Sequence, residues 1–117
     1  MLTSFVCAVD VGTGSARAGI LDSHGNLLGR AERPIAMHQP KPDHAEHDSE
    51  NIWSAVCAAV RAAREKTNVA ASDIVGISFD ATCSLVVRGR RGDQLSVSVT
   101  GEKRWDTIVW LDHRAIA

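Results

Sequence analysis

Residues 3–21 read TSFVCAVDVGTGSARAGIL, two short apolar runs on either side of a glycine-containing segment. Residues 3–9 are rich in Phe, Val, Cys and Ala, and residues 16–21 are apolar apart from Arg17. Short apolar runs bounded by turn residues predict buried β-strands. The segment between them, residues 10–15, has the composition of a turn. We therefore expect a strand–turn–strand unit with two glycines at its tip.

The residues that follow extend this unit into a meander. A second turn is expected at residues 22–26, where Asp, Ser, Gly and Asn gather. A third strand is expected over residues 27–33, and Pro34 should end it. Three short strands joined by tight turns predict an antiparallel arrangement.

One helix is expected in the middle of the chain. Residues 37–48 hold two prolines and three histidines, which favours an extended loop over a metal site built on a helix. Asp48 or Ser49 can cap the helix that follows, and the pattern fades by Asn68. Its buried stripe is expected to contain Ile52, Val56, Val60 and Ala63.

The second half of the chain alternates strands and turns. Strands are expected at residues 74–79, 84–87, 95–99 and 107–111. Turns are expected at residues 80–83 and at the basic, glycine-bearing residues 88–94. The order β-β-β-α-β-β-β predicts an α/β fold with a mixed sheet.

Composition excludes several classes of protein. The chain has 117 residues, 44% of them hydrophobic and 23% charged, which predicts one globular domain. Thirteen basic residues face fourteen acidic ones, and only 4% of residues are aromatic. A non-specific polyanion binder would be more basic, and a binder that stacks single-stranded bases would have more aromatic residues. Nucleic acid is therefore not an expected partner.

The sequence also predicts a cytoplasmic protein. No apolar run approaches the roughly 18–20 residues of a membrane span, and the first residues do not resemble a signal peptide. Cys7, Cys57 and Cys83 are odd in number and form no C-x-x-C pair, so reduced thiols are expected. A homodimer remains possible.

The glycine-containing turn has the chemistry of a phosphate site. Two glycines let backbone N–H groups approach an anion, two hydroxyls add donors, and Arg17 adds a positive charge. Asp10 can serve Mg²⁺. The candidate phosphate- and Mg²⁺-binding residues are Asp10, Gly12, Thr13, Gly14, Ser15 and Arg17. Neither the P-loop pattern nor the dinucleotide pattern fits, and a plain turn capped by Asp10 is the alternative.

Four segments together resemble the FGGY family of carbohydrate kinases. Residues 10–17 resemble its first phosphate motif, and residues 40–53 resemble its loop before the first helix. Residues 76–84 resemble its sugar-site turn, and residues 109–115 resemble its W-x-D-x-R segment. The motifs occur in family order over most of the chain. The resemblance implies a ribonuclease-H-like fold of the actin and hexokinase type, with ATP and Mg²⁺ as cofactors.

The turn at residues 79–83, FDATC, most resembles the D-ribulokinase branch of that family. Glycerol kinases carry an Arg-Glu pair where this chain has Ala81 and Thr82, so a pentulose is favoured over glycerol as the substrate. The resemblance implies that the sugar or sugar alcohol is bound by Asp80, Thr82, Cys83, Trp110, Asp112 and Arg114. The residues themselves leave alternatives: Asp80 could cap its turn, and Trp110 could be a core side chain. Asp112 could simply pair with Arg114.

Family members are several times longer than this chain. The resemblance places their general-base aspartate downstream of W-x-D-x-R and their adenosine-binding motifs in a second domain. Residues 1–117 are therefore expected to form the N-terminal portion of the first kinase domain, with no catalytic base of its own and no activity alone. An actin- or chaperone-like ATPase module and a non-catalytic interaction fragment are the competing interpretations.

Overall fold

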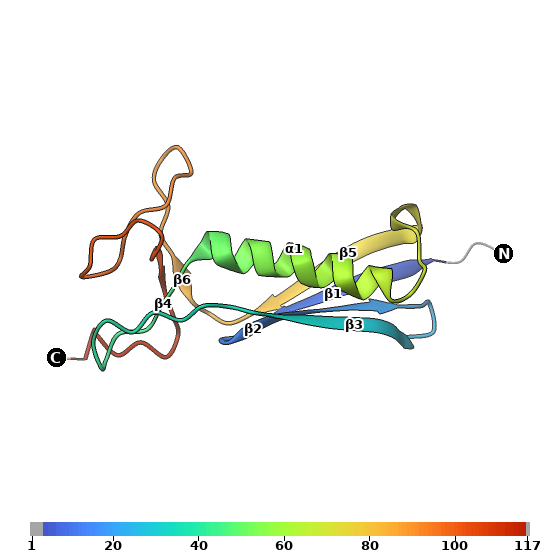
Figure 1. The fold of residues 1–117 in the computed structure, drawn as a ribbon, viewed down its shortest axis with the longest axis horizontal. Helices are drawn as coiled ribbons and strands as arrows, with labels where there is room; N and C mark the ends of the chain where they lie inside the picture. Colours follow the sequence, from blue (N-terminus) through green and yellow to red (C-terminus); the bar gives the residue numbers. More distant parts are fainter. Residues whose placement is uncertain (1–3, 117) are drawn as a thin grey trace.

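The computed structural model describes residues 4–116 and has a four-stranded mixed sheet as its main element (Figure 1). The strands are β1 (Phe5–Val11), β2 (Ser15–Leu21), β3 (Leu27–Pro34) and β5 (Ile74–Ala81). Their order is β3-β2-β1-β5; the first three are antiparallel, and β5 runs parallel to β1. This confirms the expected α/β class and the meander. Thr3, where the first strand was expected to begin, lies outside the described residues.

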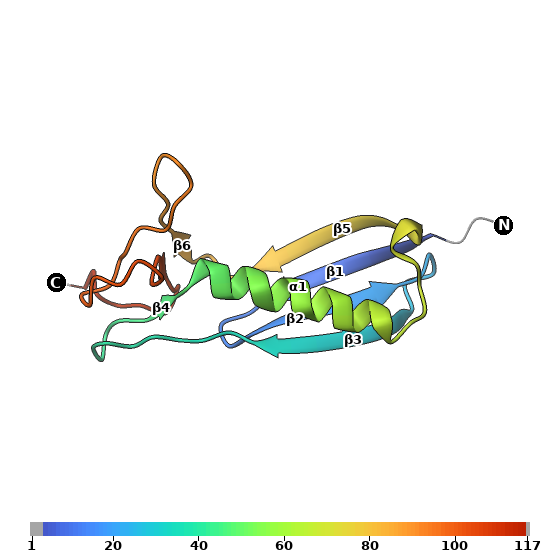
Figure 2. The same cartoon turned by 45° about the horizontal axis from the view of Figure 1, so that its top comes forward.

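A long helix, α1 (Ser49–Glu65), lies across one face of this sheet (Figures 1 and 2). Asp48 is its N-cap, and its carboxylate accepts the backbone N–H groups of Glu50 and Asn51. The core between helix and sheet consists of small and branched side chains, among them Cys7, Val9, Ala18, Ile20, Val56, Ala59 and Ala63. Small residues on both sides bring the helix close to the strands, since close packing requires short side chains at the contact.

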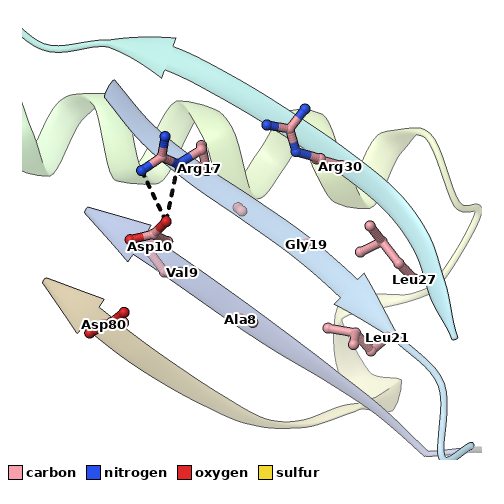
Figure 3. A pocket seen from close by; sticks show the side chains of 10 residues that line it. Ala8, Val9, Asp10, Arg17, Gly19, Leu21, Leu27, Arg30 and Asp80 are labelled. Carbon is pink, nitrogen blue, oxygen red and sulfur yellow. Dashed lines mark hydrogen bonds and ion pairs between the residues drawn. The ribbon is translucent and has the colours of Figure 1, made fainter. Parts of the chain in front are cut away.

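The other face of the sheet is not covered by α1. Ala8, Gly19 and Leu21 line a shallow depression on it, with charged residues at one end (Figure 3). The alternation of β1 and β2 decides which residues face this way, because successive side chains of a strand point to opposite faces. This face therefore presents Asp10 and Arg17, while their neighbours Val9 and Ala18 are buried.

A second, three-stranded sheet lies near the N-terminal end of α1, beyond the tip of the β1–β2 hairpin (Figure 1). It consists of β4 (Glu46–His47), β7 (Thr107–Ile108) and β6 (Leu85–Val86), in the order β4-β7-β6. Both pairings are antiparallel. A 3-10 turn, η1 (Ala71–Asp73), precedes β5. Because β4 lies in residues expected to be a loop, the prediction for residues 37–48 was wrong at its end.

The remaining differences concern the ends of strands and one expected strand that does not form. β1 and β5 each continue two residues further than expected, because the pairs Asp10–Asp80 and Val11–Ala81 extend their ladder. Residues 95–99 do not form the expected strand, since the Ser96 hydroxyl accepts the backbone N–H of Ser98 in a local turn. The strands expected at residues 84–87 and 107–111 are each only two residues long, whereas α1 ends at Glu65, in agreement with a pattern that fades by Asn68.

Within residues 4–116, no helix combines the length and the apolar character needed to cross a membrane.

Candidate functional site

The tip of the β1–β2 hairpin lies beside the end of β5 and carries a row of charged residues. Arg17 and Asp80 are the register partners of Asp10 on the two neighbouring strands. Figure 3 shows Arg17 reaching across to Asp10, with Asp80 on the adjacent strand. One cation and two carboxylates therefore lie side by side on the open face. In α/β sheets, ligands bind preferentially beyond the carboxyl ends of the strands, which is where this row lies for β1 and β5.

Asp10 and Arg17 form a side-chain pair. Arg17 Nε and Nη2 lie 3.1 Å and 3.0 Å from Asp10 Oδ2, and the two side chains are 36% and 53% exposed for Arg17 and Asp10 respectively. Within residues 4–116, Asp10 Oδ1 has no hydrogen-bond partner. The sequence left open whether Asp10 caps the turn. The structure instead places it inside β1, holding the guanidinium against the hairpin.

Gly12 makes room for that guanidinium. A Cβ added at Gly12 would lie 2.5 Å from Arg17 Nη2 and 3.3 Å from the carbonyl oxygen of Ser15. The Gly12 amide donates to that same carbonyl at 2.9 Å, which closes the tip of the hairpin. Any larger residue would therefore push the cation away from the loop. This is a physical reason for glycine that the sequence pattern alone did not reveal.

Thr13, at the centre of the tip, is held at two atoms, one bonded to a side chain of β4 and one to a side chain in the turn after β7. Its carbonyl oxygen lies 2.8 Å from Nε2 of His47, in β4. Its hydroxyl oxygen lies 2.8 Å from Nε1 of Trp110 and accepts the indole N–H, because an indole nitrogen can only donate. The hydroxyl hydrogen of Thr13 thus remains available to a ligand. The two partners are 34 and 97 residues away in sequence.

A second turn, after β5, is hydrogen-bonded to the hairpin. The Thr82 amide donates to the Val11 carbonyl at 3.3 Å, and the Ser84 hydroxyl accepts the backbone N–H of Trp110 at 3.2 Å. Thr82, Cys83 and Trp110 line a small open pocket, and the Trp110 side chain is largely exposed. The structure therefore brings three of the expected sugar-site residues together, directly beside Thr13.

Asp112 and Arg114 occupy a different environment. The Asp112 side chain is only 1% exposed; its Oδ2 accepts the Ala45 amide at 2.6 Å and lies 2.7 Å from Arg114 Nη2. Arg114 also donates to Glu46 Oε2 at 2.8 Å, and Glu46 Oε1 is bonded to His38. The hydrogen bonds from Arg114 hold the pKa of Asp112 well below its ordinary value. These residues form a largely buried network and do not line the pocket, and the pair of Asp112 and Arg114 is the salt-bridge arrangement that the sequence left open.

His47 is the residue that sequence reasoning missed. It is 1% exposed, and burial lowers the pKa of its imidazole, although the hydrogen bond to the Thr13 carbonyl opposes that shift. The ring is therefore neutral near pH 7. The sequence showed His47 only as one of three histidines before the helix. Its position in β4 could not be recognised, because a two-residue strand has no detectable alternation.

These pKa shifts predict that the free energy of unfolding falls as the solution becomes acidic. Folding lowers the pKa of His47, so the unfolded chain takes up its proton from about its ordinary value of 6.5 downward while the folded chain resists. The stabilisation is complete above that value and disappears as the pH falls through the folded pKa. Burial alone would raise the pKa of Glu46, but hydrogen bonds, led by that from Arg114, lower it below its ordinary value of about 4.5. The free energy of unfolding therefore falls a second time as the pH drops below about 4.5.

Urea unfolding of the chain between about pH 8 and about pH 3 measures this dependence. In His47→Gln, the decrease in unfolding free energy that begins near pH 6.5 should disappear, while the decrease below about pH 4.5 should remain. If stability instead rises as the pH falls below 6.5, His47 is not a buried neutral group.

Comparisons with known proteins relate the chain to one family. Residues 5–116 match the model of the "FGGY family of carbohydrate kinases, N-terminal domain". The chain is 41% identical over 113 residues to the human FGGY carbohydrate kinase domain-containing protein, covering 97% of this chain and 20% of that protein. It is 42% identical over 114 residues to a D-ribulokinase of Saccharomyces cerevisiae, covering 96% of this chain and 16% of the enzyme. The chain spans about a fifth of the length of the curated relatives it matches.

Two solved structures show the same fold. A xylulose kinase from Rhodospirillum rubrum superposes with a TM-score of 0.79 at 24% identity, over 94% of this chain and 21% of that one. A gluconate kinase from Lactobacillus acidophilus superposes with a TM-score of 0.78 at 22% identity, over 94% of this chain and 20% of that one.

Proposed function

Because the chain belongs to the FGGY family of carbohydrate kinases, we propose that it provides the phosphate-binding hairpin and one wall of the acceptor site of an ATP-dependent pentulose kinase. In this proposal residues 1–117 are the N-terminal portion of the first kinase domain. The hairpin tip binds the terminal phosphates of ATP, and the pocket beside it receives the sugar.

The observation that supports this most directly is the hydrogen bond between Trp110 and Thr13. It places the pocket of Thr82, Cys83 and Trp110 one side chain away from the hairpin tip. Phosphoryl transfer depends on holding the acceptor hydroxyl in line with the γ-phosphorus, so a kinase needs its two binding sites in contact. A plain β-turn would have no reason to be joined to an exposed tryptophan in this way.

The hairpin tip has the donors that an anion needs. The Thr13 hydroxyl has a free hydrogen, because its oxygen already accepts from Trp110. Within residues 4–116, the amide N–H of Gly14 has no hydrogen-bond partner, and Gly14 is exposed. Arg17 lies across the loop as a fixed charge. Backbone N–H groups together with a guanidinium form the kind of cradle that binds phosphate.

The residues present also fit a Mg²⁺ ion. Asp10 keeps Oδ1 free, and Asp80 is exposed on the adjacent strand. Residues 4–116 contain no group of three or more metal-ligating side chains. This suits Mg²⁺, which retains several waters and is held by one or two carboxylates together with substrate phosphates. When bound, the ion would neutralise phosphate charge, and Asp10 would hold it through Oδ1.

A pentulose is the proposed acceptor. The curated relatives include a D-ribulokinase at 42% identity and a glycerol kinase of Rhizobium meliloti at 34% identity over 113 residues. The turn has Ala81 and Thr82 in place of the charged pair that grips glycerol. Trp110 offers an apolar platform, and Thr82 and Cys83 offer small polar groups beside it.

The free cysteines Cys7, Cys57 and Cys83 support a reducing, cytoplasmic setting.

We expect residues 1–117 alone to bind MgATP weakly and to transfer no phosphate. A general base must be a group free to accept a proton, such as an unpaired carboxylate, within reach of the acceptor hydroxyl. Asp10 is paired with Arg17, and Asp112 is buried and bonded to Arg114. In this proposal Asp10 serves Mg²⁺ and the exposed Asp80 serves the sugar, and the resemblance places the general-base aspartate downstream of the W-x-D-x-R segment.

A chimeric kinase tests the proposal. Residues 5–116 would replace the matching segment of the Saccharomyces cerevisiae D-ribulokinase, and ADP release would be followed with D-ribulose, D-xylulose and glycerol. We expect activity that depends on a pentulose and not on glycerol. Gly12→Ala should lower kcat/KM by about 10- to 100-fold, because it displaces Arg17 from the loop.

The control is Asp22→Ala, in the exposed turn between β2 and β3 at the far end of the sheet, which should leave the rate unchanged. A folded chimera whose ATP hydrolysis is not stimulated by any of the sugars would refute the kinase assignment. Stimulation by glycerol alone would refute only the choice of acceptor.

A further inference from the structure

His47 and the hairpin tip are joined by a hydrogen bond whose direction is decided by chemistry. A carbonyl oxygen can only accept, so Nε2 of His47 must carry the hydrogen in the 2.8 Å contact with the Thr13 carbonyl. The ring is buried and lies in β4, where Glu46 and His47 pair with Ile108 and Thr107 of β7. The donor is thus held by a sheet that is separate from the hairpin itself.

This bond has a consequence for the next peptide group. The described chain contains no cis peptide bond, and in a trans peptide the C=O and the following N–H point in opposite directions. When the Thr13 carbonyl points inward to His47, the Gly14 N–H must point outward. Gly14 is exposed, and its amide has no partner within residues 4–116.

The other backbone hydrogen bonds of the loop do not fix the direction of this peptide. The Gly12 amide bonds to the Ser15 carbonyl, and the Gly14 carbonyl accepts the Ile35 amide at 2.9 Å. Neither bond involves the peptide group between Thr13 and Gly14. A Cβ built at Gly14 would meet nothing within 4 Å, so Gly14 faces open space on that side. His47 is the one described side chain bonded to the Thr13 carbonyl.

We propose that His47 is a positioning residue that orients the Thr13–Gly14 peptide, so that the Gly14 N–H faces the ligand as a phosphate donor. The part of this statement that concerns phosphate rests on the proposed function. The part that concerns the direction of the peptide does not. A donor that is already aimed at the ligand costs no reorganisation when the ligand arrives, which is how preorganised N–H groups stabilise anions.

Nuclear magnetic resonance of the ¹⁵N-labelled chain tests the peptide direction without any ligand. In the wild-type chain, the proton of His47 should be found on Nε2. In His47→Met, which has a similar volume and no donor, the Gly14 amide resonance should shift and its hydrogen exchange should change, while the amides of β1 and β3 stay as they were. His47→Gln, whose Nε2 can still donate, should restore the wild-type Gly14 signal.

Binding of MgATP and of magnesium tripolyphosphate then tests the ligand part. Affinity should fall by about tenfold in His47→Met, which corresponds to one lost hydrogen bond, and return in His47→Gln. A neutral wild-type ring with its proton on Nδ1 would overturn the proposal, and this measurement needs no variant. A Gly14 amide unaffected by His47→Met, or equally disturbed in His47→Gln, would also overturn it.

The positioning role of His47 and the proposed function are refuted by different results. If the wild-type chain binds neither polyphosphate while the Gly14 amide responds to His47→Met and is restored by His47→Gln, the proposed function loses its support and the role of His47 in orienting the peptide stands.

Discussion

Replacing Gly29 with alanine is expected to lower the melting temperature of the chain by about 15 °C, which corresponds to about 3 kcal/mol for a domain of this size. Gly29 lies in β3 where that strand passes the last turn of α1. An added Cβ would lie 2.7 Å from the carbonyl oxygen of Ala63 and against the Thr67 methyl group. The carbonyl belongs to the helix backbone, so strand and helix must separate.

That separation would affect the whole core. Ala59 and Ala63 have no measurable exposure and pack against the sheet between β2 and β3. The Lys66 ammonium donates to the Arg30 carbonyl at 2.7 Å beside the contact. Because interiors are close-packed, a displacement at one end of the helix opens voids along its length, and each void costs free energy.

Gly76→Ala is the matched control, because Gly76 also lies inside a strand of the same sheet. A Cβ built there meets nothing within 4 Å. Alanine in a strand loses less conformational entropy on folding than glycine, so this variant should be as stable as the wild type or slightly more stable. Thermal unfolding followed by circular dichroism measures both. Equal melting temperatures for the two variants would contradict the close approach of β3 to α1.

Asp106→Ala is expected to have the second large effect, a loss of about 3 kcal/mol of unfolding free energy. The Asp106 side chain has no exposure. It accepts the Ser49 amide at 2.9 Å, the Ser49 hydroxyl, and the Thr107 hydroxyl at 3.0 Å, and it lies 3.5 Å from Arg88 Nε. Its removal leaves the Ser49 amide, the first of α1, and the buried Thr107 hydroxyl without an acceptor, and the Ser49 hydroxyl keeps only its contact with Arg88.

The charge of Asp106 is part of this effect. Burial alone would raise the pKa of its carboxyl, but the hydrogen bonds led by that from the Ser49 hydroxyl outweigh burial and lower the pKa. The negative charge also lies at the N-terminus of α1, where the helix dipole stabilises it. Asp106→Asn keeps one acceptor oxygen and loses the charge, so we expect an intermediate loss.

Asp22→Ala is the comparison variant, because the hydrogen bonds of Asp22 lie in a turn exposed to solvent. Asp22 accepts the amides of His24 and Asn26 in an exposed turn, and hydrogen bonds led by that from the Asn26 side chain lower its pKa. Its carboxylate bonds resemble those of Asp106, but solvent can replace them, so its loss should be clearly smaller. Urea unfolding measures all three variants. If Asp22→Ala is as damaging as Asp106→Ala, burial does not set the cost.

The sequence predicted the main sheet correctly because its signals are local. The short apolar runs, the turns at residues 10–15 and 22–26 and the cap at Asp48 act through nearby residues, and the structure has the meander and α1 where they were expected. The four motifs also identified the family, which the match over residues 5–116 confirms. Errors occurred where pairing decides the element, as in β4 and in the extra residues of β1 and β5.

The candidate site was likewise predicted only in part from the sequence. Residue types at the hairpin indicated phosphate chemistry, and that assignment stays a prediction. The sequence could not tell that Trp110 bonds to Thr13 while Asp112 turns away into a buried pair with Arg114, although the two residues are two positions apart. The chain turns after β7, and this turn, not the residue types, sends the two side chains to different places.

By itself, then, the sequence determined the family, the α/β class and the antiparallel meander, and it predicted phosphate chemistry at the hairpin tip. Only the tertiary structure decided which groups hold that tip in shape. Its supports are His47 and Trp110, which are 34 and 97 residues from Thr13. Local patterns encode strands, turns and caps, because those depend on neighbouring residues. A contact across such distances exists only after two sheets have formed and packed against each other.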